Sequence, residues 1–174
     1  RNTSFSASWY ADKATADDYA ELNKTIRNIG NAYGCKGKPE LFGYTLPKSA
    51  LGKQTDKKKI QPAGYKHTVC LIDCDGAEIA GTVDKQRSGH IPCNARASNE
   101  YASKTVMVHA YDRHPNVAVC NYLRAMNVSF SKERFAINEL VQWLWRSAIR
   151  NGQPIHVAIL SRRMRELFLA WLDS

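Results

Sequence analysis

The sequence predicts an α/β fold: a layered sheet with partly parallel strands and flanking helices. From Thr105 onward, apolar patterns alternate as strand, helix, helix, strand and helix, an order typical of parallel strands joined by helical crossovers. The chain has 174 residues, enough for one well-packed domain but not for two large ones. We expect residues 1–65 to form a helix and an irregular segment, and residues 66–174 to form an α/β unit. Together they would make one compact body.

The first predicted helix begins at Thr15, a residue type that caps helix N-termini. The two aspartates at positions 17 and 18 lie in its first turn, where acidic groups interact favourably with the helix dipole. Gly30 is expected to end it. Four residues at helical spacing supply the apolar face: Tyr19, Leu22, Ile26 and Ile29.

Residues 31–65 contain closely spaced glycines and prolines and are predicted to be a long connection without regular structure. The basic cluster Lys57–Lys59 lies within this segment and is interpreted either as a solvated loop or as a contact to a phosphate backbone. Gly52 to Thr55 superficially resembles a phosphate-binding loop. The leading glycine is absent, because position 47 is proline, so no such loop is predicted.

A β-hairpin is predicted next, with strands at residues 67–74 and 77–83 joined by Asp75-Gly76, a dipeptide that favours a type I′ turn. Asp73 and Asp75 could hold magnesium at a strand end, but the hairpin accounts for both without a metal. The five cysteines, at positions 35, 70, 74, 93 and 120, form no Cys-x-x-Cys pair. No zinc site is predicted, and the cysteines are expected to be small buried hydrophobic residues.

Five further elements follow. They are a strand at residues 105–111, a short helix at 115–126, a long helix at 135–150, a strand at 155–160 and a final helix from Ser161. Gly152 is placed as the cap after the long helix. Four residues of the final helix are predicted to face the core: Met164, Leu167, Phe168 and Trp171.

The long helix carries a row of polar side chains opposite its apolar stripe. At about 100° per residue, Gln142, Arg146 and Arg150 fall on one side of the helix. The row is interpreted either as a solvated face or as a set of planar donors for phosphate oxygens. Trp143 and Trp145 lie nearer the edges of the stripe and are expected to pack against neighbouring elements.

Three arginines, Arg162, Arg163 and Arg165, crowd the first turn of the final helix. Cations at this end oppose the helix dipole, so the pattern breaks a local rule. An anion bound there, such as a nucleic-acid phosphate, would contact both the free backbone N–H groups and the guanidinium groups, so the three arginines are predicted nucleic-acid contacts. The alternative is a tolerated surface cluster that costs a few tenths of a kcal/mol per charge.

The net charge is +9, from 25 Lys and Arg against 16 Asp and Glu. This balance favours a polyanionic partner, nucleic acid before membrane. No run approaches the roughly 20 apolar residues needed to span a bilayer. An odd number of cysteines without a visible secretory signal favours reduced thiols, so a cytoplasmic location is expected.

Two stretches, Asn94 to Tyr101 and Gln142 to Arg150, resemble the C-terminal part of superfamily 2 helicases found in phages and mobile elements. The resemblance covers about residues 90–172. It implies a RecA-like second half, with Gln142 and either Arg146 or Arg150 facing a nucleotide, one arginine acting on the transferring phosphoryl group. Trp145 stands where the common helicase motif has glycine. The residues that the resemblance places on nucleic acid are Asn94, Arg96, Ser98 and Asn99.

This resemblance implies DNA or RNA as the partner. ATP and Mg²⁺ would bind only together with a first RecA-like domain, on another chain or in a longer form of this one, because the sequence has no phosphate-binding loop. The leading hypothesis is therefore the C-terminal domain of a helicase or nucleic-acid-stimulated ATPase. The alternatives are a non-catalytic nucleic-acid-binding protein and a viral structural or assembly protein with a basic surface facing the genome.

Overall fold

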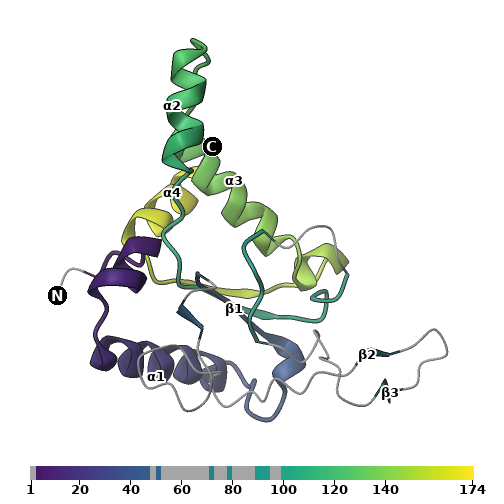
Figure 1. Ribbon diagram of the computed structural model, residues 1–174. Coiled ribbons are helices and arrows are strands. Elements are labelled where there is room, and N and C mark those ends of the chain that lie inside the picture. Colours follow the sequence, from purple (N-terminus) through teal and green to yellow (C-terminus); the bar gives the residue numbers. More distant parts are fainter. Residues whose placement is uncertain (1–2, 48–49, 52–70, 73–77, 80–88, 95–98) are drawn as a thin grey trace.

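A parallel three-stranded sheet forms the centre of the computed structural model, which describes residues 3–47, 50–51, 71–72, 78–79, 89–94 and 99–174. The strand order is β1-β4-β5 (Figure 1). Val106 is paired with Phe42 on one side and with His156 on the other. The bounds are β1 Phe42–Thr45, β4 Val106–His109 and β5 His156–Ile159. The predicted α/β class with parallel strands and flanking helices is confirmed.

Helices cover both faces of this sheet (Figure 1). Helix α1 packs with β1 and β4 in one apolar core, where Tyr19, Leu22 and Ile26 are buried. Helices α3 and α4 pack in a second core on the other face, which contains Met107 and Trp143. The helix bounds are α1 Ala16–Ala32, α2 Val117–Ala125, α3 Lys132–Leu144 and α4 Arg162–Leu172. Short helical turns occur at η1 Trp9–Lys13, η2 Pro39–Leu41 and η4 Ala148–Asn151.

Strand β1 corrects the prediction that residues 31–65 lack regular structure. All four of its residues are buried, and it is an outer strand of the sheet. A Cβ at Gly43 would lie 2.7 Å from Ile91 Cδ1 and 2.9 Å from Met107 Sδ, so glycine allows the close packing there. Sequence reasoning missed the strand because four residues between glycine- and proline-rich stretches give too short a pattern.

Helix α1 begins as predicted, with Thr15 and Asp18 forming a reciprocal capping box. Its predicted end at Gly30 is wrong by two residues. Gly30 is buried within the helix, and the left-handed residue that follows the helix is Gly34, with φ +76°. Gly34 therefore has the conformation that glycine adopts at helix ends.

Helix α3 differs most from its prediction. It begins at Lys132, capped by Ser131, and ends at Leu144 rather than Arg150. After a turn, the short η4 begins, and the backbone N–H of Ala148 donates to Lys104 O. The Ala148 N–H, which in a continued helix would donate to Leu144 O, therefore donates to the segment just before β4. Gly152, with φ +70°, caps η4 and not the long helix that it was predicted to cap, whose C-cap is Trp145.

The hairpin is confirmed where it is described. Strands β2 Leu71–Ile72 and β3 Glu78–Ile79 pair antiparallel, with Leu71 opposite Ile79. Asp73, Asp75 and the predicted turn lie outside the described residues, as do Lys57–Lys59, Cys70 and Cys74.

One expectation about helix faces needs correction, and a second helix is unusually exposed. In α4, Met164 is buried and Leu167 and Phe168 pack against the second core, but Trp171 is 44% exposed. Helix α2 forms at the predicted place, yet none of its residues is buried. It projects away from the sheet in Figure 1. The thiol-bearing residue on this helix, Cys120, is accordingly half-buried, whereas Cys35 is fully buried as predicted.

Candidate functional site

The carboxyl edge of the sheet, where all three parallel strands end, gathers buried polar side chains. Thr45 and His109 are the last residues of β1 and β4 and lie opposite each other in the register. Thr45 Oγ1 lies 3.0 Å from Cys93 Sγ. Parallel α/β sheets commonly bind ligands at this edge, because the loops and helix N-termini that follow the strands converge there.

His109 lies inside this cluster with its ring against Trp143, at 5.4 Å between centroids and in an edge-to-face arrangement. Within the described residues, its Nδ1 has no hydrogen-bond partner. Burial, reinforced by the positive charge of Arg113, lowers the pKa of His109 to about 3. The imidazole is therefore neutral at physiological pH. Burial likewise raises the pKa of the Cys93 thiol, which the bond to Thr45 partly offsets.

Two ion pairs follow β4 at the same edge. Arg113 donates to Glu139 of α3, with 2.8 Å between Nη2 and Oε2, and its guanidinium also lies over the Tyr111 and Phe135 rings. Arg163 of α4 pairs with the buried Asp112 at 2.6 Å. These pairs connect the segment after β4 to α3 and α4, so they fix the loop that borders the edge.

The N-terminal segment covers part of this edge. The Tyr10 hydroxyl donates to Ala110 O at 2.6 Å, and the Asp112 backbone N–H donates to Phe5 O. Tyr10 packs in the same core as α1. The part of this edge that the N-terminal segment leaves uncovered is next to α3.

A hollow of about 520 Å³ lies on that side, and we call it the α3 hollow. It combines a guanidinium, two amides, two hydroxyls and two aromatic rings beside the paired Glu139. Arg134, Asn138 and Gln142 follow each other at intervals of one helical turn along α3, which brings their side chains into the same hollow. The lining residues are Ser129, Phe130, Ser131, Arg134, Phe135, Asn138, Glu139 and Gln142.

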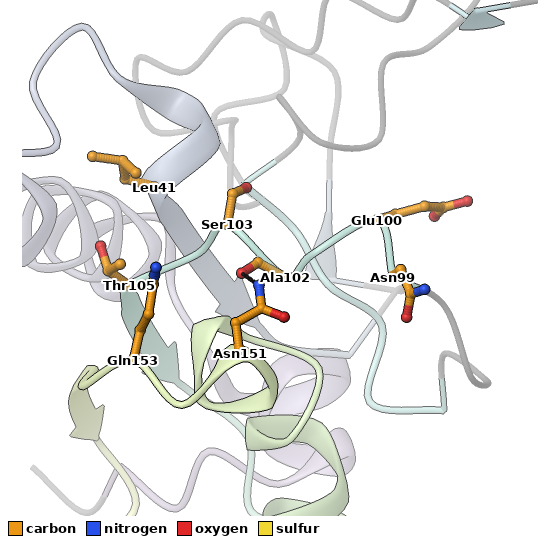
Figure 2. Close-up of a pocket in the computed structure, with 8 residues that line it drawn as sticks. All are labelled: Leu41, Asn99, Glu100, Ala102, Ser103, Thr105, Asn151 and Gln153. Atoms are coloured by element: carbon orange, nitrogen blue, oxygen red, sulfur yellow. Dashed lines mark hydrogen bonds between the residues drawn. The ribbon is translucent and has the colours of Figure 1, made fainter.

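A second hollow, of about 490 Å³, lies at the amino edge of the sheet (Figure 2). Leu41 and Thr105 come directly before β1 and β4, and Gln153 precedes β5. The Asn151 amide, which points into this region, donates to Ala102 O at 3.3 Å. The polar groups here are neutral apart from Glu100.

The structure separates the predicted polar row. Gln142 is exposed in the α3 hollow. Arg146 lies in the turn after α3, half-buried, with Nη1 3.5 Å from Cys93 O. Arg150 lies in η4 next to Asn151, which lines the amino-edge hollow. The helix ends before Arg146, so the three side chains no longer share one helical face. Their catalytic roles remain predictions.

The predicted nucleic-acid contacts fall at two edges. Asn99 lines the amino-edge hollow, whereas α4 begins at the carboxyl edge directly after β5. Asn94 is exposed, and Arg96 and Ser98 lie outside the described residues. Asn99 and the α4 arginines therefore lie at opposite edges of the sheet and do not form one surface.

Each of the three α4 arginines contacts its own chain. Arg162 pairs with Glu166, Arg163 with Asp112, and Arg165 donates to Ile159 O at 3.1 Å. Intramolecular acceptors therefore offset the unfavourable position of these cations at the helix N-terminus. A role in binding an anion remains a prediction.

Sequence reasoning missed Thr45, Cys93, His109 and the Arg113–Glu139 pair. The signal for Arg134 and Asn138 was present, because they precede Gln142 by eight and four residues. The signal for Thr45 was not, since its strand was not recognised. Among the described residues, no group of three or more His, Cys, Asp or Glu side chains is placed to hold a metal ion.

Residues 1–172 match the family described as the YonV C-terminal Rossmann-like domain. This chain belongs to that family. The parallel sheet with helices on both faces is the architecture that a Rossmann-like domain requires. Membership supports a Rossmann-like fold and does not extend to the helicase family.

One curated relative is the "SPbeta prophage-derived uncharacterized protein YonV" of Bacillus subtilis (strain 168). It is 42% identical over 86 residues, which are 49% of this chain and 21% of that protein. The matched part thus spans about a fifth of the relative's length. No solved structure gives a significant match. In the part of the chain that the structure describes, no helix is long and apolar enough to cross a membrane.

Proposed function

We propose that this Rossmann-like domain binds single-stranded nucleic acid, with the α3 hollow as the contact surface. The observation that carries the proposal is the convergence of Phe130, Arg134, Asn138 and Gln142 in one hollow, which the Glu139–Arg113 ion pair connects to the segment that leaves the carboxyl edge of the sheet after β4. Rossmann-like domains use this edge for ligands. The relative named above is prophage-derived, and the net charge of +9 favours a polyanionic partner such as nucleic acid.

The chemistry of the hollow suits a nucleotide unit. An aromatic ring offers a stacking surface that every base can use, and Phe130 is 38% exposed. Arg134 can reach a phosphate with two donors, and the amides of Asn138 and Gln142 can bond to base edges. Glu139, the one carboxylate of the hollow, is paired with Arg113, so its charge is largely offset.

The surrounding charge favours an anionic strand. Residues 101–174 contain ten Lys and Arg against five Asp and Glu. In the first turn of α3, the exposed Lys132 is offset by Glu133, which bonds to Ser131 of the hollow, so the excess positive charge comes from the rest of this half of the chain. Counterion release should therefore contribute to affinity, and binding should weaken as salt rises.

The test is fluorescence anisotropy with labelled single- and double-stranded DNA and RNA at several salt concentrations. Arg134→Ala should weaken binding and reduce the slope of log K against log salt by about 0.7, the value for one phosphate contact on a single strand. Phe130→Ala should lower affinity by about 1–3 kcal/mol without changing that slope, because stacking involves no ion release.

Arg27→Ala is the matched control. It also removes one exposed arginine, but from α1, which covers the opposite face of the sheet. Binding that is absent at low salt, or equal losses from Arg27→Ala and Arg134→Ala, would refute the α3 hollow as the contact.

The helicase function is a second candidate, favoured by one observation: Gln142 lines the hollow, and Arg146, in the turn directly after α3, approaches the Cys93 backbone. In that case Gln142, with Arg146 or Arg150, would act on ATP and Mg²⁺ held by a first RecA-like domain. The chain alone should then hydrolyse no ATP. Either Arg146→Ala or Arg150→Ala should abolish strand-stimulated hydrolysis once that domain is supplied, and unchanged hydrolysis in both variants would eliminate this candidate.

A further inference from the structure

Helix α2 presents an apolar stripe to solvent. Val119, Tyr122 and Met126 recur at i, i+3 and i+7 and therefore lie on one side, with Leu123 beside them. Val119 is 51% exposed, Tyr122 65% and Met126 60%. The polar Asn121 and Arg124 fall on the opposite side. An amphipathic helix in a domain normally turns such a stripe towards its own core, and α2 does not.

The helix is nevertheless well closed at both ends. The Asn116 side chain accepts from the Ala118 N–H, and Asn127, with φ 55°, allows the Val128 N–H to donate back to Leu123 O. Nine residues are still fewer than the roughly 12–15 needed for a helix that is stable alone in water. Packing of the stripe against a partner would supply the missing stabilisation.

The stripe is complementary to a copy of itself. When two α2 helices run antiparallel about an axis between residues 122 and 123, Val119 faces Met126 of the partner, and Tyr122 faces Leu123. The helix has one charged residue, Arg124, which in this arrangement lies level with the partner's Asn121 rather than its arginine. Like charges are kept apart, and the two helix dipoles are opposed, which is favourable.

We propose that α2 is a dimerisation helix that pairs antiparallel with α2 of a second copy. Met126 and Val128 extend the exposed apolar surface beyond the end of the helix. At about 100 Å² for each of the four half-exposed large side chains, the buried area is on the order of 400 Å² per protomer, the size of a weak and transient contact. The dimer is therefore weak, with a dissociation constant in the micromolar range.

Sedimentation velocity across protein concentrations from about 1 to several hundred micromolar tests this, a range set by the affinity expected for a small interface. The chain should pass from monomer to dimer. Val119→Glu should weaken dimerisation at least tenfold. Val117→Glu is the matched control, because Val117 is 72% exposed on the same helix but lies on the side opposite the stripe, so its dimerisation should be unchanged.

Because Val119→Glu could also unfold α2, a crosslinking measurement tests the interface without introducing a charge. In a Cys120→Ser background, Tyr122→Cys places a thiol next to the axis, and Val117→Cys places it away from the axis. With diamide as the oxidant, the first variant should form a disulfide-linked dimer and the second should not. A chain that stays monomeric at every concentration, or equal crosslinking of both variants, overturns the proposal and leaves the stripe to another occupant, such as a further part of a longer chain.

Discussion

Helices α1 and α2 are built from similar patterns and have opposite fates. Both were predicted from apolar residues at helical spacing, and both begin at a side-chain cap, Thr15 and Asn116. Helix α1 buries Tyr19, Leu22 and Ile26 against the sheet, with Ile26 fully inaccessible. Helix α2 has no fully buried residue. Periodicity therefore predicts that a helix forms and which side is apolar, but it does not identify the surface that covers that side.

The largest expected contrast is in core truncation. Ile26→Ala should lower the free energy of unfolding by about 2–5 kcal/mol, because it leaves a cavity in a packed core. Tyr122→Ala removes a larger side chain, yet it should change the free energy by less than about 0.5 kcal/mol, since Tyr122 is 65% exposed. Urea denaturation at sub-micromolar protein keeps dimerisation out of the measurement. A loss above 2 kcal/mol for Tyr122→Ala would mean that α2 packs on its own domain.

Lowering the pH should destabilise the core but should not affect dimerisation through α2. His109 has a folded-state pKa of about 3, below the unfolded value near 6.5, so the unfolded chain binds more protons between these values. Stability is therefore full above about pH 6.5 and falls as the pH is lowered, by about 1.4 kcal/mol at pH 5.5. The stripe on α2 contains no histidine or carboxylate, so dimerisation should not follow the same curve.

His109→Leu should flatten this pH dependence, whereas the exposed His156→Leu serves as the control and should leave it intact. Thermal unfolding between pH 7.5 and 5.5 provides the readout. An unchanged slope in His109→Leu would show that other groups cause the acid sensitivity.

The smallest contrast concerns the caps. Thr15→Ala should cost about 1 kcal/mol of global stability, because α1 is part of the packed core. Asn116→Ala removes a comparable bond but should only fray α2, leaving the global denaturation midpoint unchanged. Amide hydrogen exchange in α2 together with the denaturation midpoint separates the two effects. An equal fall in the midpoint for both variants would contradict this view.

The parts of the fold that the sequence predicted are those with local causes. Thr15 and Ser161 cap α1 and α4 through contacts three residues away, so their positions were readable from the chain. Strand β1 depends on a partner strand distant in sequence, and its four residues carry no distinctive pattern. After the early end of α3, the Ala148 N–H donates to Lys104 O, a contact distant in sequence that no local rule anticipates.

The candidate site was predictable to a smaller extent. Gln142 was singled out and does line a hollow. Arg113, Glu139 and His109 were not, because their relation comes from β4 and α3 meeting at one edge of the sheet. The α4 arginines lie at a helix N-terminus, where cations oppose the helix dipole, and the sequence showed this anomaly. The structure explains it by ion pairs within the chain, from Arg163 to Asp112 and from Arg162 to Glu166.

The central position of β4 has a consequence for how the chain folds. Val106 pairs with Phe42, 64 residues earlier, and with His156, 50 residues later. Both pairings close long loops, and the entropy of closure differs between them by only about 0.2 kcal/mol. Loop length therefore does not decide which neighbour joins β4 first. The well-capped α3 lies between β4 and β5 and can form locally, which brings these two strands closer together before they pair. The unit from β4 to β5 should therefore assemble before β1 and α1 dock. Because both strand pairings are distant in sequence, folding as a whole should be slow for a domain of this size.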